Sequence, residues 1–184
     1  KLSMTSPPAG DPNAVNDAAK LLVAAENPLI IAGRSARTPK GIELLVELAN
    51  LLGARVNDQR NRMNFPSTNP FSVGGNVADS DVILGLEVQD FFNSTHRNGR
   101  PVFKAGTKTI TITALELSHK ANYQDFGRYA ESDIAIPADA EATLPWLIEA
   151  CKKLMTGDRR RAADERRSKA EEAYKRAHEV TRQQ

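Results

Sequence analysis

The stretch NPLIIAGRSARTP, residues 27–39, decides the fold. Its run LIIAG, residues 29–33, is apolar throughout, which is typical of a strand buried on both faces of a sheet. Thr38 and Pro39 then give the pattern of a helix that begins with a threonine cap and a proline in its first turn. A buried strand followed at once by a helix is the unit from which parallel α/β sheets are built.

The same alternation continues on both sides of this stretch. A helix is expected over residues 12–26 with Asp11 as its cap, and the helix that begins near Thr38 should end at Gly53. Further short strands are expected at residues 54–56, 81–86, 109–113 and 133–136. We therefore predict an α/β fold, a doubly wound parallel sheet of about five to six strands with helices on both faces, which is Rossmann-like.

Three segments lie outside this alternation. Residues 58–78 predict a long connection, and residues 89–106 are polar with a clear turn at 98–101. After Asp139 an apolar stripe predicts a helix, for which Thr143 is a second candidate cap and Pro145 should lie in the first turn or cause a kink.

The predicted domain division has a linker at each end. Residues 1–10 are interpreted as a linker and residues 11–156 as the Rossmann-like domain. Residues 157–184 are interpreted as a charged helical extension, solvated and weakly anchored because its apolar stripe is mostly alanine.

Composition excludes several classes of protein. The 25 Lys and Arg residues nearly balance 23 Asp and Glu residues, which argues against a nucleic-acid-binding domain. No apolar window is long enough to cross a membrane. The single cysteine, Cys151, fits a reducing compartment such as the cytoplasm, and it lies on an apolar stripe where a buried thiol is expected. The three histidines have no Ser, Cys or Asp partner at a recognised spacing, so no catalytic triad and no metal site is predicted.

The loop after the first strand is the first candidate site. Ligands of open parallel sheets bind beyond the carboxyl ends of the strands, and a helix N-terminus there can hold a phosphate, with Arg34 and Arg37 adding charge. A dinucleotide fingerprint needs three glycines, however, and only Gly33 is present. Phosphate binding and an ordinary strand-to-helix turn remain open, and the turn is favoured.

The loop over residues 57–76 is the second candidate. Residues that could line a groove for an anionic ligand are Arg60, Arg62, Asn64, Gly74 and Gly75. In the alternative, favoured reading the glycines form a turn and three apolar residues cover the sheet edge, namely Phe65, Phe71 and Val73.

Carboxylates and aromatic residues outside these loops have simpler interpretations. Glu87 and Asp90 follow the third strand, where an acidic side chain could reach a ribose hydroxyl, but capping or solvation is favoured for both. Trp146, Phe91, Phe92 and Tyr123 are interpreted as core or interface aromatics.

Several segments in order resemble the central domain of thiamine-diphosphate-dependent enzymes, with acetolactate synthase and its relatives as the nearest group. The segments are AAKLL (18–22), NPLIIAG (27–33), ELLVELA (43–49), LGARV (52–56), NFPSTNP (64–70), ADSDVILGL (78–86) and IAIPADA (134–140). The resemblance covers about residues 12–155. It implies a lyase or transferase that decarboxylates or joins 2-keto acids, and a homodimer or homotetramer as the parent assembly.

Members of that family have three α/β domains. An N-terminal domain grips the aminopyrimidine with a glutamate, and a C-terminal domain holds the diphosphate and Mg2+ through Gly-Asp-Gly followed by Asn-Asn. That motif is absent from these 184 residues. The resemblance therefore implies that thiamine diphosphate and Mg2+ are bound outside this chain, that the chain alone is not catalytic, and that its partners are the missing N- and C-terminal domains.

Some relatives bind FAD or an ADP-containing ligand across the central domain. They use a glycine-rich turn after the first strand, a Gly-Met-His-Gly-like segment and an Asp-Arg pair. The corresponding segments here are GRS (33–35), SVGGN (72–76) and LEVQD (86–90), and these departures argue against FAD. Gly33, Arg34 and Gly74 remain the candidate nucleotide contacts, and the alternative function is a free-standing module that binds ADP, FAD or NAD.

Overall fold

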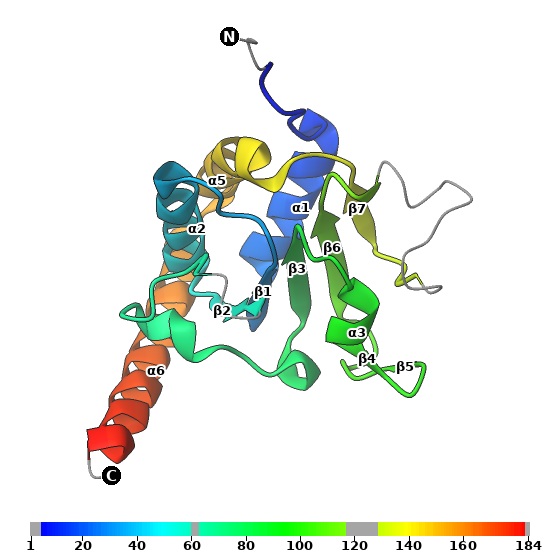
Figure 1. The fold of residues 1–184 in the computed structure, drawn as a ribbon. Coiled ribbons are helices and arrows are strands. Elements are labelled where there is room, and N and C mark those ends of the chain that lie inside the picture. The colour runs from blue at the N-terminus through cyan, green and yellow to red at the C-terminus, as the bar shows by residue number, and fades with distance from the viewer. Residues whose placement is uncertain (1–4, 60–62, 117–128, 183–184) are drawn as a thin grey trace, which may run out of the picture.

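One parallel sheet organises the chain. The computed structural model describes residues 5–59, 63–116 and 129–182. Five strands run in the order β2-β1-β3-β6-β7 (Figure 1). They are β1 (Pro28–Ala32), β2 (Arg55–Asp58), β3 (Val82–Leu86), β6 (Lys108–Ile112) and β7 (Ile134–Ile136). Because β2 and β3 lie on opposite sides of β1, the winding reverses there, and the predicted α/β fold is confirmed.

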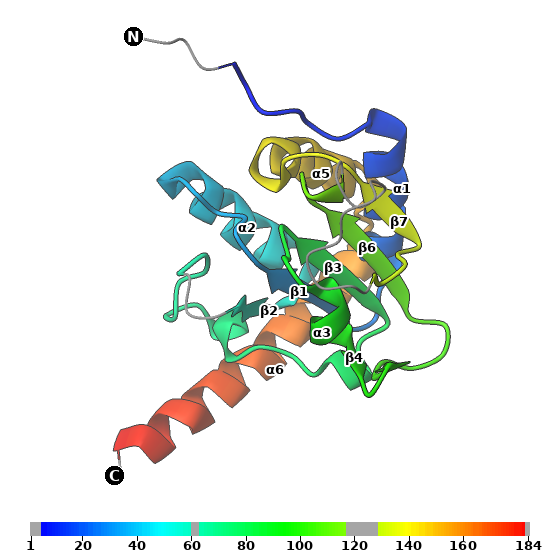
Figure 2. The same cartoon turned by 45° about the vertical axis from the view of Figure 1, so that its right-hand side comes forward.

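Alternate residues of the strands face two different layers. Ile30 and Ala32 join the main core beneath α1 (Pro12–Ala24), α2 (Pro39–Leu52) and α5 (Ala140–Leu154). Leu29 and Ile31 face the other side, where α3 (Phe91–Thr95) lies over a smaller apolar cluster (Figure 2). The sheet is thus covered on both faces, which explains why its strands read as unbroken apolar runs.

The long connections contain short elements. The described residues between β2 and β3 include the 3-10 turns η2 (Pro70–Val73) and η3 (Val77–Asp79). Between α3 and β6 the hairpin of β4 (His96–Arg97) and β5 (Arg100–Pro101) turns at Asn98 and Gly99, whose φ angles are 51° and 75°. The predicted turn is therefore confirmed as a tight hairpin with two left-handed residues.

Most predicted caps are confirmed, but the start of α5 differs. Asp11 and Thr38 cap α1 and α2, and Gly53 ends α2 with a φ of 60°. Asp139 caps α5 through a hydrogen bond from Ala142 N, so Thr143 is not the cap. Pro145 lies inside the helix beyond its first turn, so the first of its two predicted places is wrong, and the kink stays a prediction. The chain entering the domain is fixed to this helix, because Gly10 N donates to Thr143 Oγ1 at 3.0 Å.

The first half of α6 (Gly157–Arg182) is anchored more firmly than its composition predicts. Ala163 and Ala170 are fully buried, and a methyl group at Gly53 would lie 2.6 Å from the Ala163 carbonyl oxygen. Arg166 donates to the carbonyl of Leu52 at 2.7 Å. The prediction of a weakly anchored helix is therefore wrong for this half. Small residues such as alanine and glycine allow two helices to pack closely, and a prediction from hydropathy does not take this into account. The remainder extends away from the domain (Figure 1).

Two of the apolar side chains interpreted from the sequence are exposed. Phe65 and Phe71 are buried beside β2 as predicted, but Val73 is 42% exposed. Trp146 is 66% exposed and so is not a core residue. No helix in the described ranges is long and apolar enough to cross a membrane.

Candidate functional site

The carboxyl end of the sheet gathers the predicted site residues of the first loop. Gly33 N donates to the carbonyl of Leu86 at 2.8 Å, and Arg34 N donates to the carbonyl of Glu87 at 3.1 Å. A methyl group at Gly33 would lie 2.0 Å from that Glu87 carbonyl oxygen. The loops after β1 and β3 are therefore in direct backbone contact at the winding reversal, where ligands of such sheets usually enter.

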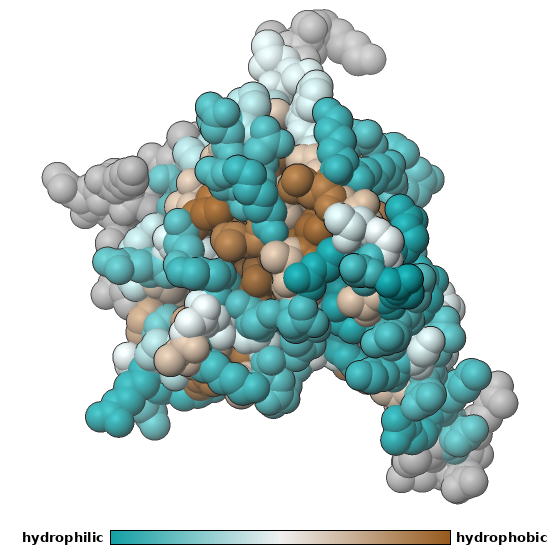
Figure 3. Space-filling model, turned by 180° about the vertical axis from the view of Figure 1, so that it is seen from behind, coloured by the Kyte–Doolittle hydropathy of each residue, from teal (hydrophilic) through white to brown (hydrophobic). Residues whose placement is uncertain are grey.

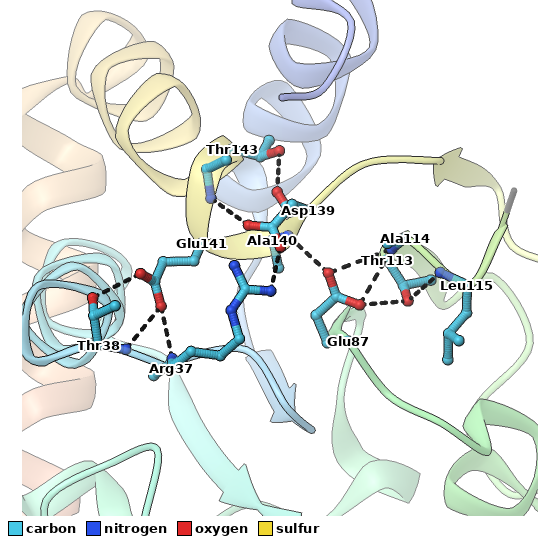
Figure 4. A network of polar contacts seen from close by, with 12 residues as sticks. Arg37, Thr38, Glu87, Thr113, Ala114, Leu115, Asp139, Ala140, Glu141 and Thr143 are labelled. Carbon is cyan, nitrogen blue, oxygen red and sulfur yellow. Dashed lines mark hydrogen bonds and ion pairs between the residues drawn. The ribbon is translucent and has the colours of Figure 1, made fainter. Parts of the chain in front are cut away.

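Glu87 joins three elements at this end of the sheet (Figure 4). Its carboxylate accepts hydrogen bonds from Thr113 Oγ1 at 2.8 Å, Ala114 N at 3.2 Å and Ala140 N at 2.9 Å. Ala140 is the first residue of α5, so a carboxylate occupies the position at that helix N-terminus where an anion is favoured. The prediction that Glu87 has a capping role is confirmed.

The backbone of Glu87 is unusual as well. Its φ is 48°, in the left-handed region that costs a non-glycine residue about 1–2 kcal/mol. A residue stays in such a conformation only when its surroundings fix it. The contacts of the carboxylate to the residues after β6 and to α5 supply that constraint.

The N-terminus of α2 is occupied in the same way, by Glu141. This carboxylate accepts from Arg37 N at 2.7 Å and from Thr38 N at 3.2 Å, and Thr38 Oγ1 donates to it at 2.7 Å (Figure 4). A methyl group at Gly41 would lie 2.2 Å from the same carboxylate. A phosphate held by this helix would need the space that the Glu141 carboxylate fills.

Arg37 completes the network between the two helix starts. Its guanidinium forms an ion pair with Asp139, whose side chain is buried. The hydrogen bond to Asp139 raises the pKa of Arg37 above its ordinary value, against the lowering effect of burial. The charge of Arg37 is thus paired within the domain. The side chain of Arg34, in the same loop, is exposed.

Gly74 lies beside the edge strand and not beside Gly33. Its φ is 79°, and its carbonyl accepts from Arg55 at 3.1 Å. The Asn57 amide forms hydrogen bonds to both the N–H and the carbonyl of Gly75. Among the described residues no hydrogen bond joins Gly74 to Gly33 or Arg34. The three residues named as nucleotide contacts are therefore not linked by hydrogen bonds among the described residues, and their role stays a prediction.

An open groove of about 490 Å3 follows β2, near the second candidate loop. Its lining is Val56, Asn57, Asp58, Met63, Phe65, Ser67, Ser72, Val73 and Gly74. Among the described residues of this lining, Asp58 carries a charge. Arg60 and Arg62 lie outside the described residues.

Asn64, which was also a candidate for the groove after β2, is buried and links two loops by hydrogen bonds. It donates to the carbonyl of Gly33 at 2.7 Å and to Asp58 Oδ1 at 2.7 Å, and it accepts from Ala36 N at 3.1 Å. All the hydrogen-bonding capacity of its amide except one lone pair is used inside the domain. Asn64 therefore locks the loop after β1 to the end of β2.

The other residues considered from sequence have structural roles. Asp90 caps α3 through Asn93 N at 2.9 Å. His96 stacks on Phe92 with ring centroids 4.2 Å apart, while His119 and Tyr123 lie outside the described residues. Burial raises the pKa of the Cys151 thiol to about 12, as expected for an inert core thiol. In the described ranges no group of His, Cys, Asp and Glu could hold a metal ion.

Sequence reasoning missed Glu141 and the pairing of Arg37 with Asp139. Glu141 and Thr38 are 103 residues apart, so no local pattern links them. The available signal was the placement of Glu141 in the first turn of a helix, where acidic residues complement the helix dipole.

Comparison with known structures finds the same fold in thiamin diphosphate-dependent enzymes. The chain aligns with a thiamin diphosphate-dependent enzyme from Mycobacterium smegmatis at TM-score 0.58 and 22% identity, covering 81% of this chain and 29% of that one. Benzoylformate decarboxylase from Polynucleobacter necessarius gives TM-score 0.57 and 18% identity, with 83% and 29% covered. The 4-hydroxybenzoylformate decarboxylase of Rhodococcus jostii RHA1 gives 0.55 and 21%, with 81% and 28% covered.

These alignments show a shared fold, and the chain spans under a third of each of those proteins. No curated protein matches the sequence. Residues 15–147, however, match the family model described as the thiamine pyrophosphate enzyme, central domain. That match covers well over half of the chain, and with the strand order and the continuous segments above it shows that this chain belongs to the family of thiamine pyrophosphate enzyme central domains.

Proposed function

We propose that this chain is the structural and interface domain of a thiamine-diphosphate-dependent enzyme resembling acetolactate synthase. The parent enzyme decarboxylates or joins 2-keto acids, with its catalytic residues on domains outside this chain. Residues 11–156 form the central domain, and α6 leads toward the domain that follows. The single, buried Cys151 fits a parent enzyme of the cytoplasm.

The observation that carries this proposal is the filling of anion positions by the domain's own carboxylates. Glu141 occupies the N-terminus of α2, and Glu87 occupies that of α5. In a nucleotide-binding sheet of this kind, a pyrophosphate takes the position at the helix after the first strand. The domain's own carboxylates therefore accept the hydrogen bonds of backbone N–H groups that would otherwise bind the phosphates of a nucleotide.

The cofactor of the family does not fit the described residues either. Mg2+ with a diphosphate requires a set of oxygen ligands, usually carboxylates. At the carboxyl end Glu87, Glu141 and Asp139 are engaged in caps and an ion pair, and Asp58 accepts hydrogen bonds from Asn64 and Phe65 N. Thiamine diphosphate and Mg2+ thus belong to the neighbouring domains of the parent.

Calorimetric titration of the purified domain with ADP, FAD, and thiamine diphosphate plus Mg2+ tests the proposal. We expect no heat of binding for any of them. Binding of ADP, FAD or NAD would favour the alternative of a nucleotide-binding module, with Gly33, Arg34 and Gly74 as the first residues to mutate. Binding of thiamine diphosphate would contradict the assignment of the cofactor to other domains.

A matched variant tests the role of Glu141 directly. In Glu141→Ala the amides of Arg37 and Thr38 lose their acceptor, so sulfate should raise the melting temperature of this variant more than that of the unmodified domain. Glu43→Ala removes an exposed carboxylate from α2, the helix whose N-terminus Glu141 occupies, and serves as the control. Equal sulfate responses in all three proteins would show that Glu141 does not stand where an anion binds.

A further inference from the structure

The hairpin of β4 and β5 turns at a pair of residues that can react with each other. Asn98 and Gly99 are its two central residues, with φ angles of 51° and 75°, and they form the only Asn-Gly pair of the chain. An asparagine carboxamide can be attacked by the backbone nitrogen of the residue that follows it. Glycine presents this nitrogen with the least hindrance, because it has no side chain. The turn therefore holds both groups of an intramolecular reaction.

The two reacting groups have no competing contacts. Residues 97–100 are all exposed. A methyl group added to Gly99 would meet no atom within 4 Å beyond its chain neighbours, so the space beside this nitrogen is open. In the part of the chain that the structure describes, neither the Asn98 side chain nor the Gly99 N–H forms a hydrogen bond. Both groups are therefore free to react.

The hairpin lies where water reaches it. It forms a separate two-stranded sheet at the lower margin of the domain (Figures 1 and 2). Hydrophobic surface residues, which a neighbouring domain would cover first, gather instead in the middle of the side seen from behind, ringed by hydrophilic ones (Figure 3). The turn is thus placed for a reaction that consumes water.

Two other asparagines show the contrast. Asn93 is also exposed, but it lies in α3, where the N–H of the next residue, Ser94, donates to the carbonyl of Asp90 at 3.3 Å. Asn57 lies in β2, with its amide bound to both the N–H and the carbonyl of Gly75. In each of these two places, secondary structure or a side-chain contact holds one of the reacting groups.

Positive charge flanks the turn on both sides. Residues 91–107 include Arg97, Arg100 and Lys104 and contain no Asp or Glu. The attacking nitrogen must lose its proton, and nearby positive charge favours the negatively charged form of a group. The arginines that precede and follow the turn therefore favour the first step of the reaction.

We propose that Asn98 is a site of spontaneous deamidation, through a succinimide formed with Gly99. Hydroxide removes the Gly99 amide proton, the nitrogen bonds to Asn98 Cγ, and the Cγ–Nδ2 bond breaks to release ammonia. Water then opens the five-membered ring at either of its carbonyls and leaves an aspartate or an isoaspartate. Water is the only other reactant, so the inference is independent of the function proposed above.

The ring forms when the turn opens, because the main chain of Asn98 must rotate to bring its side chain to the next nitrogen. This opening has a low cost. Each strand has two residues, a length at which an isolated hairpin is marginally stable, and Pro101 has no N–H to donate to its partner His96. Such segments open locally without unfolding of the domain.

The product changes the hairpin in charge and in length. A carboxylate replaces a neutral amide between Arg97 and Arg100. Isoaspartate also adds one carbon to the main chain, and a turn of two residues cannot absorb it while Arg97 stays paired with Arg100. The hairpin that contains isoaspartate therefore stays open.

Peptide mapping by mass spectrometry of the purified chain, aged at mildly acidic and mildly alkaline pH, tests the proposal. We expect conversion of the carboxamide to a carboxyl group at Asn98 to be at least about tenfold faster than at Asn93, a difference of about 1.4 kcal/mol in activation free energy. The rate at Asn98 should rise with pH, because the deprotonated nitrogen is the attacking group.

Variants of the segment separate the reaction from general ageing. Gly99→Ala hinders the attacking nitrogen and should slow conversion at Asn98 at least about tenfold. Gly106→Ala is the matched control, since Gly106 has a φ of 89° and is equally open, and it should leave the rate unchanged. Arg100→Gln keeps the glycine and should slow the reaction about twofold, as for an exposed charge. An Asn98 that outlasts Asn93, or equal rates in Gly99→Ala and the parent, would overturn the proposal.

Discussion

The two ends of the parallel sheet are closed in different ways. At the carboxyl end, Glu87 and Glu141 bring carboxylates from one element to the backbone N–H groups of another. At the amino end, α6 packs closely on the end of α2, where the backbones of Gly53 and Ala163 meet. The carboxyl end thus depends on directed polar contacts, whereas the amino end combines such contacts, at Asp81 and Asp133, with close helix packing, and mutations should separate the two.

The backbone contact at Gly33 should be the most sensitive point. In Gly33→Ala the new methyl group would lie 2.0 Å from the Glu87 carbonyl oxygen, so the loops after β1 and β3 must separate. We expect a loss of about 3 kcal/mol or more in the free energy of unfolding, measured by urea titration. Gly157→Ala, where no atom lies within 4 Å, is the control and should change little. Equal effects of the two substitutions would contradict the close packing of these loops.

Removal of the Glu87 carboxylate tests the polar contacts themselves. Glu87→Ala leaves the Thr113 hydroxyl and the amides of Ala114 and Ala140 without their acceptor, so we expect a loss of about 2 kcal/mol in unfolding free energy. Hydrogen exchange should show faster exchange of the Ala140 amide. Glu87→Gln keeps one carbonyl acceptor and should lose less, and an alanine variant as stable as the glutamine variant would contradict the bridging role.

At the amino end, Arg166 is the corresponding polar contact. It donates to the Leu52 carbonyl at the end of α2, but its Nε is buried without a hydrogen-bond partner among the described residues. Burial lowers the pKa of Arg166, despite the opposing charges of Glu26 and Asp81. Arg166→Met keeps the length of the side chain and removes both the donor and the desolvation cost, so we expect a loss of only about 1 kcal/mol by thermal or urea unfolding. A loss as large as that of Glu87→Ala would remove the proposed difference between the two ends.

The sequence predicted local features well and distant contacts poorly. Buried strands, the caps at Asp11 and Thr38 and the left-handed Gly53 depend on neighbours within a turn or two, so their signal lies in a short window. The Arg166 contact joins residues 114 apart. Such contacts arise only once the sheet has brought the segments together.

The contrast between local signals and distant contacts also applies to the candidate site residues. Gly33 was noticed as a glycine after a buried strand, but its partner in space, Glu87, comes from another strand. Gly74 was noticed as part of a glycine pair, and its hydrogen bond to Arg55 belongs to the covering of β2. Residue type and spacing therefore drew attention to these loops, whereas the hydrogen-bond partners of the residues within them depend on the packing of β1 against β3 and of η2 against β2.

Substitution of Asp133, which lies just before β7 at the amino end of the sheet, should have the smallest effect on the free energy of unfolding. Burial raises its pKa, but hydrogen bonds from Lys108 Nζ at 2.7 Å and Thr109 N at 2.8 Å, with the charge of Lys108, outweigh this, so the pKa is lowered. A carboxylate whose pKa is lower in the folded state contributes stability above its unfolded pKa, and loses it as pH falls through the folded pKa.

Asp133→Asn should therefore cost less than about 1 kcal/mol at pH 7, because solvent screens this half-exposed pair. At about pH 2, below the unfolded pKa of aspartate, the difference between variant and parent should shrink toward zero. Urea titrations at both pH values measure it, with Asp17→Asn on the exposed face of α1 as the control. A constant difference at both pH values would mean that Asp133 acts by shape and hydrogen bonding alone, and that charge contributes as little to the amino end as packing suggests.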